Sequence, residues 1–398
     1  MSAAPLVIIG AGLAGWTTVR EFRKLDTTTP VVLVTTDNGD FYAKPSLSNA
    51  FGQKRSPAQL VTTPAAKMAE TQNVTLMAHT RVDAIDTATQ TLQLSHAGAS
   101  SALAYSQLVL ALGAQPIRVP VQGNAADQVR SINSLDDFSS FHSALSPHAE
   151  SADSSEIDSK TVLIMGAGLI GCEFANDLLQ AGHTVHVVDP ATRPLALLLP
   201  EGAGLQLQQA LAALGVAWHF GATVQAVDTD ATRLAVRLSD GSVVDADAVL
   251  SAIGLRADTT LATAAGLLCE RGIVVDELLQ TSAAHVYALG DCAQYASAGQ
   301  RTLPFVMPIM NAARALAATL AGTATPLVFP LMPVSVKTPA LPLVVSTAHP
   351  AQAGQWQADA EVADGIWRFL DPEGAQRGFV LAGKHTARRM ELAKLTLP

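Results

Sequence analysis

The sequence of 398 residues has few cysteines and a deficit of basic charge. Its three cysteines, Cys172, Cys269 and Cys292, form no C-x-x-C or C-x4-C pair, so their spacing predicts neither a cysteine-ligated metal cluster nor a redox disulfide. The 25 Lys and Arg residues are outnumbered by 34 Asp and Glu residues, which gives a formal net charge of −9. This acidic balance argues against a nucleic-acid partner, for which a basic field is expected.

Long hydrophobic runs are also missing. No apolar stretch approaches the roughly 18 to 20 residues that cross a bilayer, although 49% of the residues are hydrophobic, enough to build cores for two or three domains. No basic segment followed by an apolar run and a cleavage site precedes the first predicted strand, at Leu6. We therefore expect a cytoplasmic, monomeric protein without a membrane span and without a metal site.

A glycine-rich segment occurs twice in the chain. In each copy an apolar run, Leu6–Ile9 or Leu163–Met165, is followed by G-x-G-x-x-G. The first glycine of this pattern makes a tight turn, the second lets backbone approach a pyrophosphate, and the third lets a helix pack on a strand. The helix N-terminus then binds the phosphates through its N–H groups. Two dinucleotide sites are predicted, with Gly10, Ala11, Gly12, Leu13 and Gly15 in the first and Gly166, Gly168 and Gly171 in the second.

The residues that end the next strand differ between the copies. In the second copy the strand Val185–Val188 leads into Asp189, whose carboxylate can accept a hydrogen bond from a ribose 2′-OH and repel a 2′-phosphate. The second site is therefore predicted to favour NAD over NADP. In the first copy Val31–Val34 is followed by Thr35 and Thr36, with Asp37 the nearest carboxylate, so hydroxyl or backbone groups, or Asp37, are expected to bind that ribose.

Three further strands end on glycine. Leu108–Leu112 ends at Gly113 and Ala248–Ile253 ends at Gly254, where a glycine allows the chain to pass close to a cofactor. The stretch from Thr281 ends in Gly290-Asp291, which places a carboxylate at the end of a strand, where it can accept from a flavin's ribityl hydroxyls. A helix is predicted over residues 310–318, with its positive end available to stabilise an anionic reduced flavin.

In this order, these segments resemble the pyridine nucleotide-disulfide oxidoreductase superfamily. The stretch 42–49, where related enzymes that reduce a dithiol carry two cysteines, has none, so the likeness is to the branch that reduces iron carriers without a redox disulfide. Within that branch, Phe41–Asn49 and Val336–Val345 are most similar to rubredoxin reductases and their flavorubredoxin-reducing relatives. The resemblance covers almost the whole chain except the Ser-, Asp- and Glu-rich stretch 143–160, which is predicted to be a solvated loop.

This resemblance implies an α/β fold with two Rossmann-like, glutathione-reductase-like nucleotide domains and a small α+β C-terminal domain. It places FAD on residues 1–115 and 246–324, NADH on 116–245, and the C-terminal domain on 325–398. It also implies roles for single residues. Lys44 is expected beside the flavin, paired with Glu173 as the catalytic pair, Lys337 beside the same ring, and the backbone of Val82 against the adenine.

The function implied is NADH:rubredoxin oxidoreduction, in which hydride passes from NADH to FAD and single electrons then pass to rubredoxin, an acidic iron carrier. Four alternatives share the nucleotide motifs: a flavorubredoxin reductase, a ferredoxin reductase, an NADH oxidase, and a flavoprotein that senses NADH without turnover. A local positive patch for the carrier is expected to include Lys384, Arg388, Arg389 and Lys394.

Overall fold

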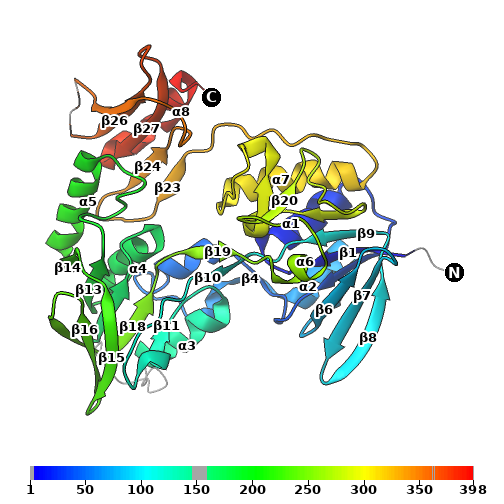
Figure 1. Ribbon diagram of the computed structural model, residues 1–398, viewed down its shortest axis with the longest axis horizontal. Coiled ribbons are helices and arrows are strands. Elements are labelled where there is room, and N and C mark those ends of the chain that lie inside the picture. Colours follow the sequence, from blue (N-terminus) through cyan, green and yellow to red (C-terminus); the bar gives the residue numbers. More distant parts are fainter. Residues whose placement is uncertain (1–3, 146–158, 361, 363, 398) are drawn as a thin grey trace. The chain divides into compact units, whose positions relative to one another are not determined.

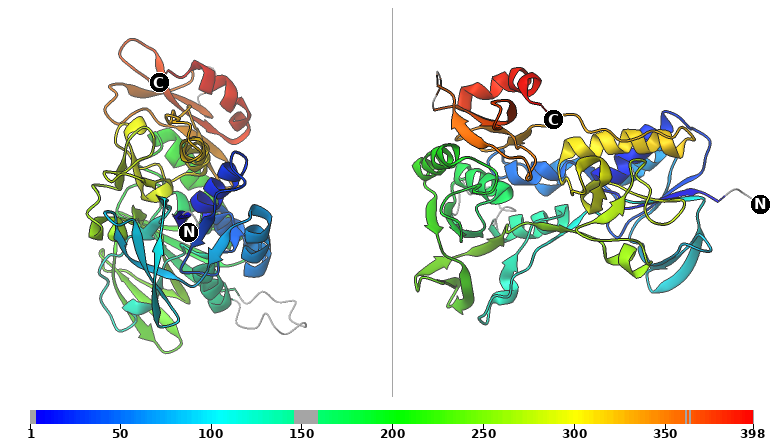
Figure 2. Two further views of the ribbon diagram at one scale, coloured as in Figure 1. Left: turned by 90° about the vertical axis from the view of Figure 1, so that its right-hand side faces the viewer. Right: turned by 45° about the horizontal axis from the view of Figure 1, so that its top comes forward.

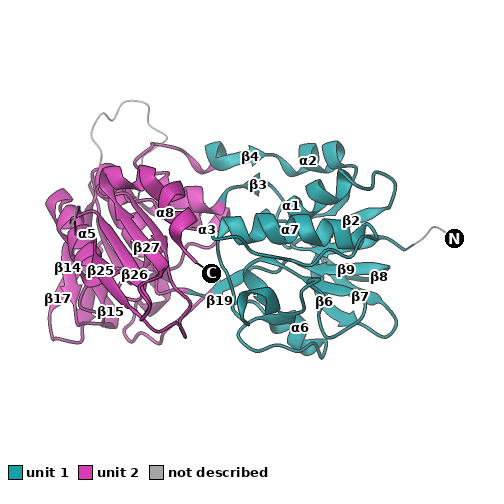
Figure 3. Ribbon diagram, turned by 90° about the horizontal axis from the view of Figure 1, so that it is seen from above, with its two compact units in different colours: residues 1–43, 58–115, 255–332 teal, residues 44–57, 116–254, 333–398 magenta. Residues whose placement is uncertain are grey.

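The computed structural model describes residues 4–145, 159–360, 362 and 364–397. Most of the loop predicted over 143–160, from 146 to 158, lies outside these described residues. The chain divides into two compact units (Figure 3), unit 1 comprising 1–43, 58–115 and 255–332, and unit 2 comprising 44–57, 116–254 and 333–398. No helix within the described ranges has the length and apolar character needed to cross a membrane.

Unit 1 is built on a parallel sheet of five strands with the order β21-β9-β1-β2-β5. Two of these strands, β1 and β9, are labelled in Figure 1. The middle strand β1 is apolar throughout and fully buried, as expected for a parallel strand covered on both faces. The sheet consists of β1 (Leu6–Ile9), β2 (Val31–Val34), β5 (Thr75–Met77), β9 (Gln107–Leu110) and β21 (Val286–Ala288).

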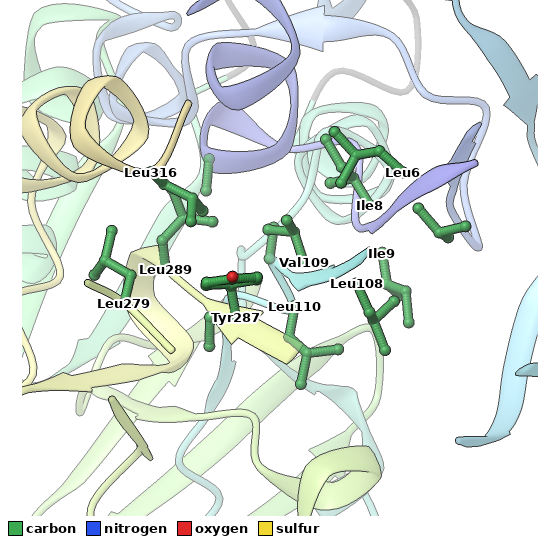
Figure 4. Close-up of a cluster of buried hydrophobic side chains, with 14 of the residues drawn as sticks. Leu6, Ile8, Ile9, Leu108, Val109, Leu110, Leu279, Tyr287, Leu289 and Leu316 are labelled. Atoms are coloured by element: carbon green, nitrogen blue, oxygen red, sulfur yellow. The ribbon is translucent and has the colours of Figure 1, made fainter. Parts of the chain in front are cut away.

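Helices α1 (Leu13–Arg23) and α7 (Val306–Leu320) lie side by side in unit 1 (Figure 2, blue and yellow). Apolar side chains from the sheet and from α7 form one core (Figure 4), which includes Leu6, Ile8, Val109, Leu110, Tyr287 and Leu316. The remaining elements of this unit are β3 (Phe41–Tyr42), η2 (Pro57–Leu60), β4 (Val61–Thr63), α2 (Ala65–Gln72), β6 (Arg81–Asp86), β7 (Thr91–His96), β8 (Ala99–Ala104), β10 (Ala114–Pro116), β19 (Leu255–Ala257), α6 (Thr260–Ala264), β20 (Ile273–Val275), η4 (Gly290–Cys292), β22 (Ala293–Tyr295) and η5 (Ala296–Ala298).

Unit 2 repeats this plan with a second parallel sheet of five strands in the order β11-β18-β12-β13-β14. The second glycine-rich turn again follows the middle strand. An antiparallel group of three strands, β15-β16-β17, corresponds to β6-β7-β8 of unit 1. The elements are η1 (Lys44–Asn49), η3 (Ala126–Gln128), β11 (Val129–Arg130), α3 (Leu135–Leu145), β12 (Thr161–Met165), α4 (Leu169–Gln180), β13 (Thr184–Asp189), α5 (Glu201–Leu214), β14 (Ala217–Phe220), β15 (Val224–Asp230), β16 (Arg233–Leu238), β17 (Val243–Ala246) and β18 (Ala248–Ser251).

The end of the chain adds an antiparallel sheet to unit 2, with the order β23-β24-β27-β26-β25. Its small core includes Val344, Ile366, Phe379 and Leu381, and Leu392 of the last helix packs on it. The α/β fold predicted from the sequence, with parallel nucleotide-type sheets and a small C-terminal α+β part, is confirmed. This part consists of β23 (Val334–Val336), β24 (Leu343–Ser346), β25 (Gln355–Ala358), β26 (Ile366–Leu370), β27 (Gln376–Ala382), η6 (Gly383–Arg388) and α8 (Arg389–Leu395).

Candidate functional site

The two glycine-rich turns have nearly the same geometry. Their first glycines, Gly10 and Gly166, have φ values of +109° and +104°, a region that side chains disfavour. A Cβ on the third glycine, Gly15 or Gly171, would lie 1.9 Å from the carbonyl oxygen of the first glycine of its own turn. Each turn therefore requires glycine at these two positions for its own shape.

The second glycine of each turn has a different environment. A Cβ built on Gly12 or Gly168 meets nothing within 4 Å, so shape alone does not require glycine there. The helices α1 and α4 begin at the next residue, and no side chain of the described residues caps either N-terminus. Open space in front of uncapped N–H groups fits a pyrophosphate in both turns.

The carboxylates near the two strand ends make different contacts. Asp189, the last residue of β13, accepts hydrogen bonds from the backbone N–H of Ala167 at 2.6 Å and of Ala191 at 2.7 Å, so it is tied to the glycine-rich turn itself. In unit 1, Asp37 accepts from the Thr35 hydroxyl at 2.6 Å and from the Gly39 N–H at 2.9 Å. The ribose roles of Asp189, Thr35 and Thr36 stay predictions.

The other predicted contacts lie at loop ends. Gly113 and Gly254 have φ values of +72° and +121°. Gly290, at +82°, packs so closely that a Cβ there would be 2.9 Å from Cβ of Ala14 in α1, which places Asp291 beside the first glycine-rich turn. Val82 precedes a register shift in the pairing of β6 with β7.

Glu173 is the centre of a buried polar group in unit 2. It lies on α4, two residues after the third glycine, and its side chain is 5% exposed. Its carboxylate accepts from Lys337 Nζ at 2.8 Å, from the Lys337 backbone N–H at 3.0 Å and from Ser48 Oγ at 2.7 Å. Lys337 Nζ also donates to Ser48 Oγ at 3.0 Å and to the carbonyl oxygen of Pro45. These three hydrogen bonds offset the free-energy cost of burying the Glu173 carboxylate.

This arrangement corrects the predicted pairing. The sequence indicated a Lys44–Glu173 pair, but the ion pair of Glu173 is with Lys337, and Lys44 Nζ donates to Asn133 Oδ1 at 2.9 Å. Both lysines were expected beside the flavin ring, but only Lys44 was expected to pair with Glu173. The backbone N–H of Lys337 also reaches Glu173, so the loop after β23 is fixed on the carboxylate and brings the Lys337 amine with it.

Sequence reasoning missed Ser48 and Asp177. Asp177 lies one turn after Glu173 on α4 and accepts from the backbone N–H of Phe51 at 3.0 Å and of Gly52 at 2.8 Å. Burial raises the pKa of Asp177 to about 6, although these backbone hydrogen bonds and Lys337 oppose the rise. The spacing of four residues from Glu173 puts both acids on one helix face and was a usable signal. Ser48 gave none, since its partner is 125 residues away.

The structure places Cys172 and Cys292 in buried positions. Both are fully buried, and burial raises the pKa of each thiol, for Cys292 to about 12. A thiol with such a pKa is protonated near neutral pH and is a poor nucleophile. The nucleotide chemistry of this fold is therefore not expected to use either thiol.

The fold and these turns are typical of a protein with two nucleotide-binding sites. Residues 4–317 match the family described as pyridine nucleotide-disulphide oxidoreductase, and residues 326–396 match the rubredoxin binding C-terminal domain. The chain is 44% identical over 391 residues to a protein of Alcanivorax borkumensis named rubredoxin-NAD(+) reductase, covering 98% of both chains. It is 37% identical to a Vibrio vulnificus protein named nitric oxide reductase FlRd-NAD(+) reductase, covering 98% of this chain and 97% of the relative.

A solved structure is similar over the same range. The putidaredoxin reductase in its covalent complex with putidaredoxin is 25% identical, with a TM-score of 0.85, and the match covers 100% of this chain and 94% of that one. The chain belongs to the pyridine nucleotide-disulphide oxidoreductase family. It is an oxidoreductase that uses a flavin and NAD(H).

Proposed function

We propose that this protein is an NADH:rubredoxin oxidoreductase that uses FAD. One observation carries the proposal: the segment that matches a rubredoxin binding domain also contributes Lys337, the cation that pairs with Glu173 on the nucleotide-binding helix α4. The C-terminal segment expected to bind the carrier and helix α4, expected to bind NADH, therefore contribute side chains to the same polar cluster. The full-length relative named rubredoxin-NAD(+) reductase supports the same partner.

We assign FAD to residues 1–115 and 246–324, NADH to 116–245, and the C-terminal domain to 325–398. The open space at Gly12 and Gly168 supports a pyrophosphate at each turn. We propose that Asp189 binds the ribose of NADH. Its carboxylate would repel the 2′-phosphate of NADPH, because both groups are negatively charged. Lys44, Val82 and Asp291 keep their predicted roles toward FAD.

The protein's own residues supply alignment and charge, while the bound flavin accepts hydride and passes on single electrons. We propose that the Lys337 amine would stabilise the negative charge that a bound flavin gains on reduction. Glu173 orients the amine of Lys337 from one side, and Ser48 and the Pro45 carbonyl hold it from the other. Glu173 is only 5% exposed and Lys337 is 30% exposed, so solvent reaches this pair mainly from the side of the lysine.

The surface expected to bind the carrier lies near the end of the chain. The C-terminal bases lie on η6 and α8, where Arg388 pairs with Glu391 at 2.5 Å. That pair reduces the positive charge of the expected patch. A flavorubredoxin reductase is the second candidate function, since a relative of that name covers 98% of the chain at 37% identity.

Anaerobic stopped-flow reduction by NADH, followed by mixing with one acceptor, separates the candidates. We expect oxidised rubredoxin to reoxidise the protein much faster than ferredoxin or oxygen. Faster reoxidation by the rubredoxin module of a flavorubredoxin would favour the second candidate, and fast reoxidation by oxygen would indicate an oxidase. NADH binding without turnover, together with a change in oligomeric state, would indicate a sensor.

A further inference from the structure

A polar cavity opens beside the Glu173–Lys337 pair in unit 2. It has a volume of about 210 Å³, and its lining includes Ser48, Gln53, Glu173, Asn176, Asp177 and Lys337. A single water needs about 10 to 15 Å³ of such volume. The cavity therefore has room for several waters in contact with both acids of α4.

One buried donor points to such waters. Asn176 is fully buried and lines the cavity, and its Oδ1 accepts from the Ala340 N–H at 3.0 Å. No atom of the described residues accepts a hydrogen bond from its Nδ2. A buried amide N–H₂ without a partner costs free energy, so a ligand with an acceptor atom is expected there. Water satisfies this donor and the neighbouring carboxylates at the same time.

The proposed reaction releases a proton that must leave the site. When one NADH reduces two one-electron acceptors, the products are NAD⁺, two reduced acceptors and one proton. The proton appears where the hydride was received, and we have assigned the Glu173–Lys337 pair to that place. This step therefore rests on the proposed function.

We propose that the cavity is the outlet for this proton, with Asp177 as the relay between Glu173 and solvent. The proton passes to the Glu173 carboxylate, which then loses it to the waters of the cavity. Asp177 takes it up one helical turn further on and gives it to bulk water past the exposed side chain of Gln53. No electron moves in these steps, and each carboxylate is regenerated.

The surroundings of Asp177 suit a relay. Among the described residues that line the cavity, the charged groups facing Asp177 are Glu173 on its own helix and Lys337 on the loop after β23. The 44–57 segment presents the Phe51 and Gly52 N–H groups, and His183 and His142 contact the ring of Phe51. An acid whose pKa lies near the working pH both accepts and releases protons efficiently, and burial raises the pKa of Asp177 to about 6.

The test compares Asp177→Asn with Asp136→Asn, the same substitution at an exposed site on α3. In weakly buffered solution, a pH-indicator dye follows proton release while NADH reduces ferricyanide. We expect Asp177→Asn to slow proton release at least fivefold and to abolish the inflection near pH 6 in its rate. Added formate should restore release, because a small acid can enter the cavity. Asp136→Asn should behave like the wild type.

Infrared titration of the resting protein gives a readout independent of turnover. A carboxyl band that titrates near pH 6 should be present in the wild type and absent from Asp177→Asn. Gln53→Leu, at an exposed position, is the second variant if Asp177→Asn does not fold, and it should slow release by a smaller factor. Unchanged release in the variants, or slowing that formate does not reverse, would overturn the relay. Failure to reduce rubredoxin while the ferricyanide results hold would overturn only the proposed carrier.

Discussion

The helices that follow the two glycine-rich turns begin alike and then differ in what they bury. Helix α1 buries Trp16, Val19 and Phe22 against apolar neighbours in unit 1. Helix α4 buries Glu173 and Asp177 at corresponding depth. Burying charge is unfavourable unless partners compensate it, and α4 obtains such partners from segments far away in the sequence. The repeated motif therefore builds two similar glycine-rich turns, and the helix after the second turn also buries two carboxylates, Glu173 and Asp177.

The largest expected effect tests the turn geometry that the two glycine-rich copies share. Gly15→Ala and Gly171→Ala should each lower the free energy of unfolding by about 3 kcal/mol or more, because the new methyl group would overlap a backbone oxygen that cannot move aside. Both Cβ positions lie 1.9 Å from that oxygen. Urea denaturation of the two variants measures the effect, and a large loss in only one copy would contradict the equivalence of the turns.

The middle glycines provide the matched control. Gly12→Ala and Gly168→Ala should change stability by less than about 1 kcal/mol, since each Cβ meets open space. Each should instead weaken binding of its own nucleotide. Flavin content after purification reports on Gly12, and NADH titration reports on Gly168.

These turns were also the most predictable part of the molecule. Strand β2 spans Val31–Val34, as predicted, and β18 spans Ala248–Ser251, within the predicted run Ala248–Ile253. Apolar β-branched runs predicted both strands because this signal is local. The helix predicted over 310–318 begins earlier, at Val306. No side chain of the described residues caps the start of this helix, so its first residue had no strong signal in the sequence.

The polar group on α4 could be predicted only in part. The resemblance to the family pointed to Glu173, two residues after the third glycine, and to both lysines. Which lysine pairs with it depends on how the loop after β23 lies on α4, and the two segments are 164 residues apart. Contacts over such separations have no periodic signature in one sequence.

The corrected pairing yields the next prediction. In double-mutant cycles with Glu173→Gln, Lys337→Met should show a coupling energy of about 1.5 kcal/mol, because it leaves a buried carboxylate without its cation. Lys44→Met should show less than about 0.5 kcal/mol with the same partner, since the Lys44 amine donates to Asn133. Stability by denaturation and the rate of flavin reduction by NADH are both measured. Stronger coupling to Lys44 would restore the pairing expected from the sequence.

Because of Asp177, the contribution of α4 to the free energy of unfolding should depend on pH, which we do not expect for α1. The pKa of Asp177 is raised to about 6 in the folded protein, above the ordinary value of about 3.9 for the unfolded chain. The folded state therefore binds this proton more tightly, and the contribution to stability falls as pH rises from about 4 to about 6. Over this pH range, the free energy of unfolding should fall by about 2 kcal/mol less in Asp177→Asn than in the wild type. Urea denaturation of both proteins across that range gives the difference, in which other titrating groups cancel, and parallel profiles would contradict the prediction.

The smallest expected effect concerns the two strand-end acids. Asp189→Ala should reduce the preference for NADH over NADPH by about 1 kcal/mol, roughly a fivefold change in the ratio of kcat/KM values, since repulsion of a partly solvated 2′-phosphate is screened by water. Asp37→Ala is the matched control in the first copy. Its carboxylate contacts Thr35 and Gly39 in unit 1, so it should leave the cofactor ratio unchanged. Asp189 also accepts from the Ala167 N–H, so its removal should weaken NADH binding slightly as well. If NADPH use improves equally in both variants, the preference arises from something other than charge at the end of β13. If neither variant changes the ratio, the role of Asp189 is to hold the glycine-rich turn, and the predicted ribose contact is wrong.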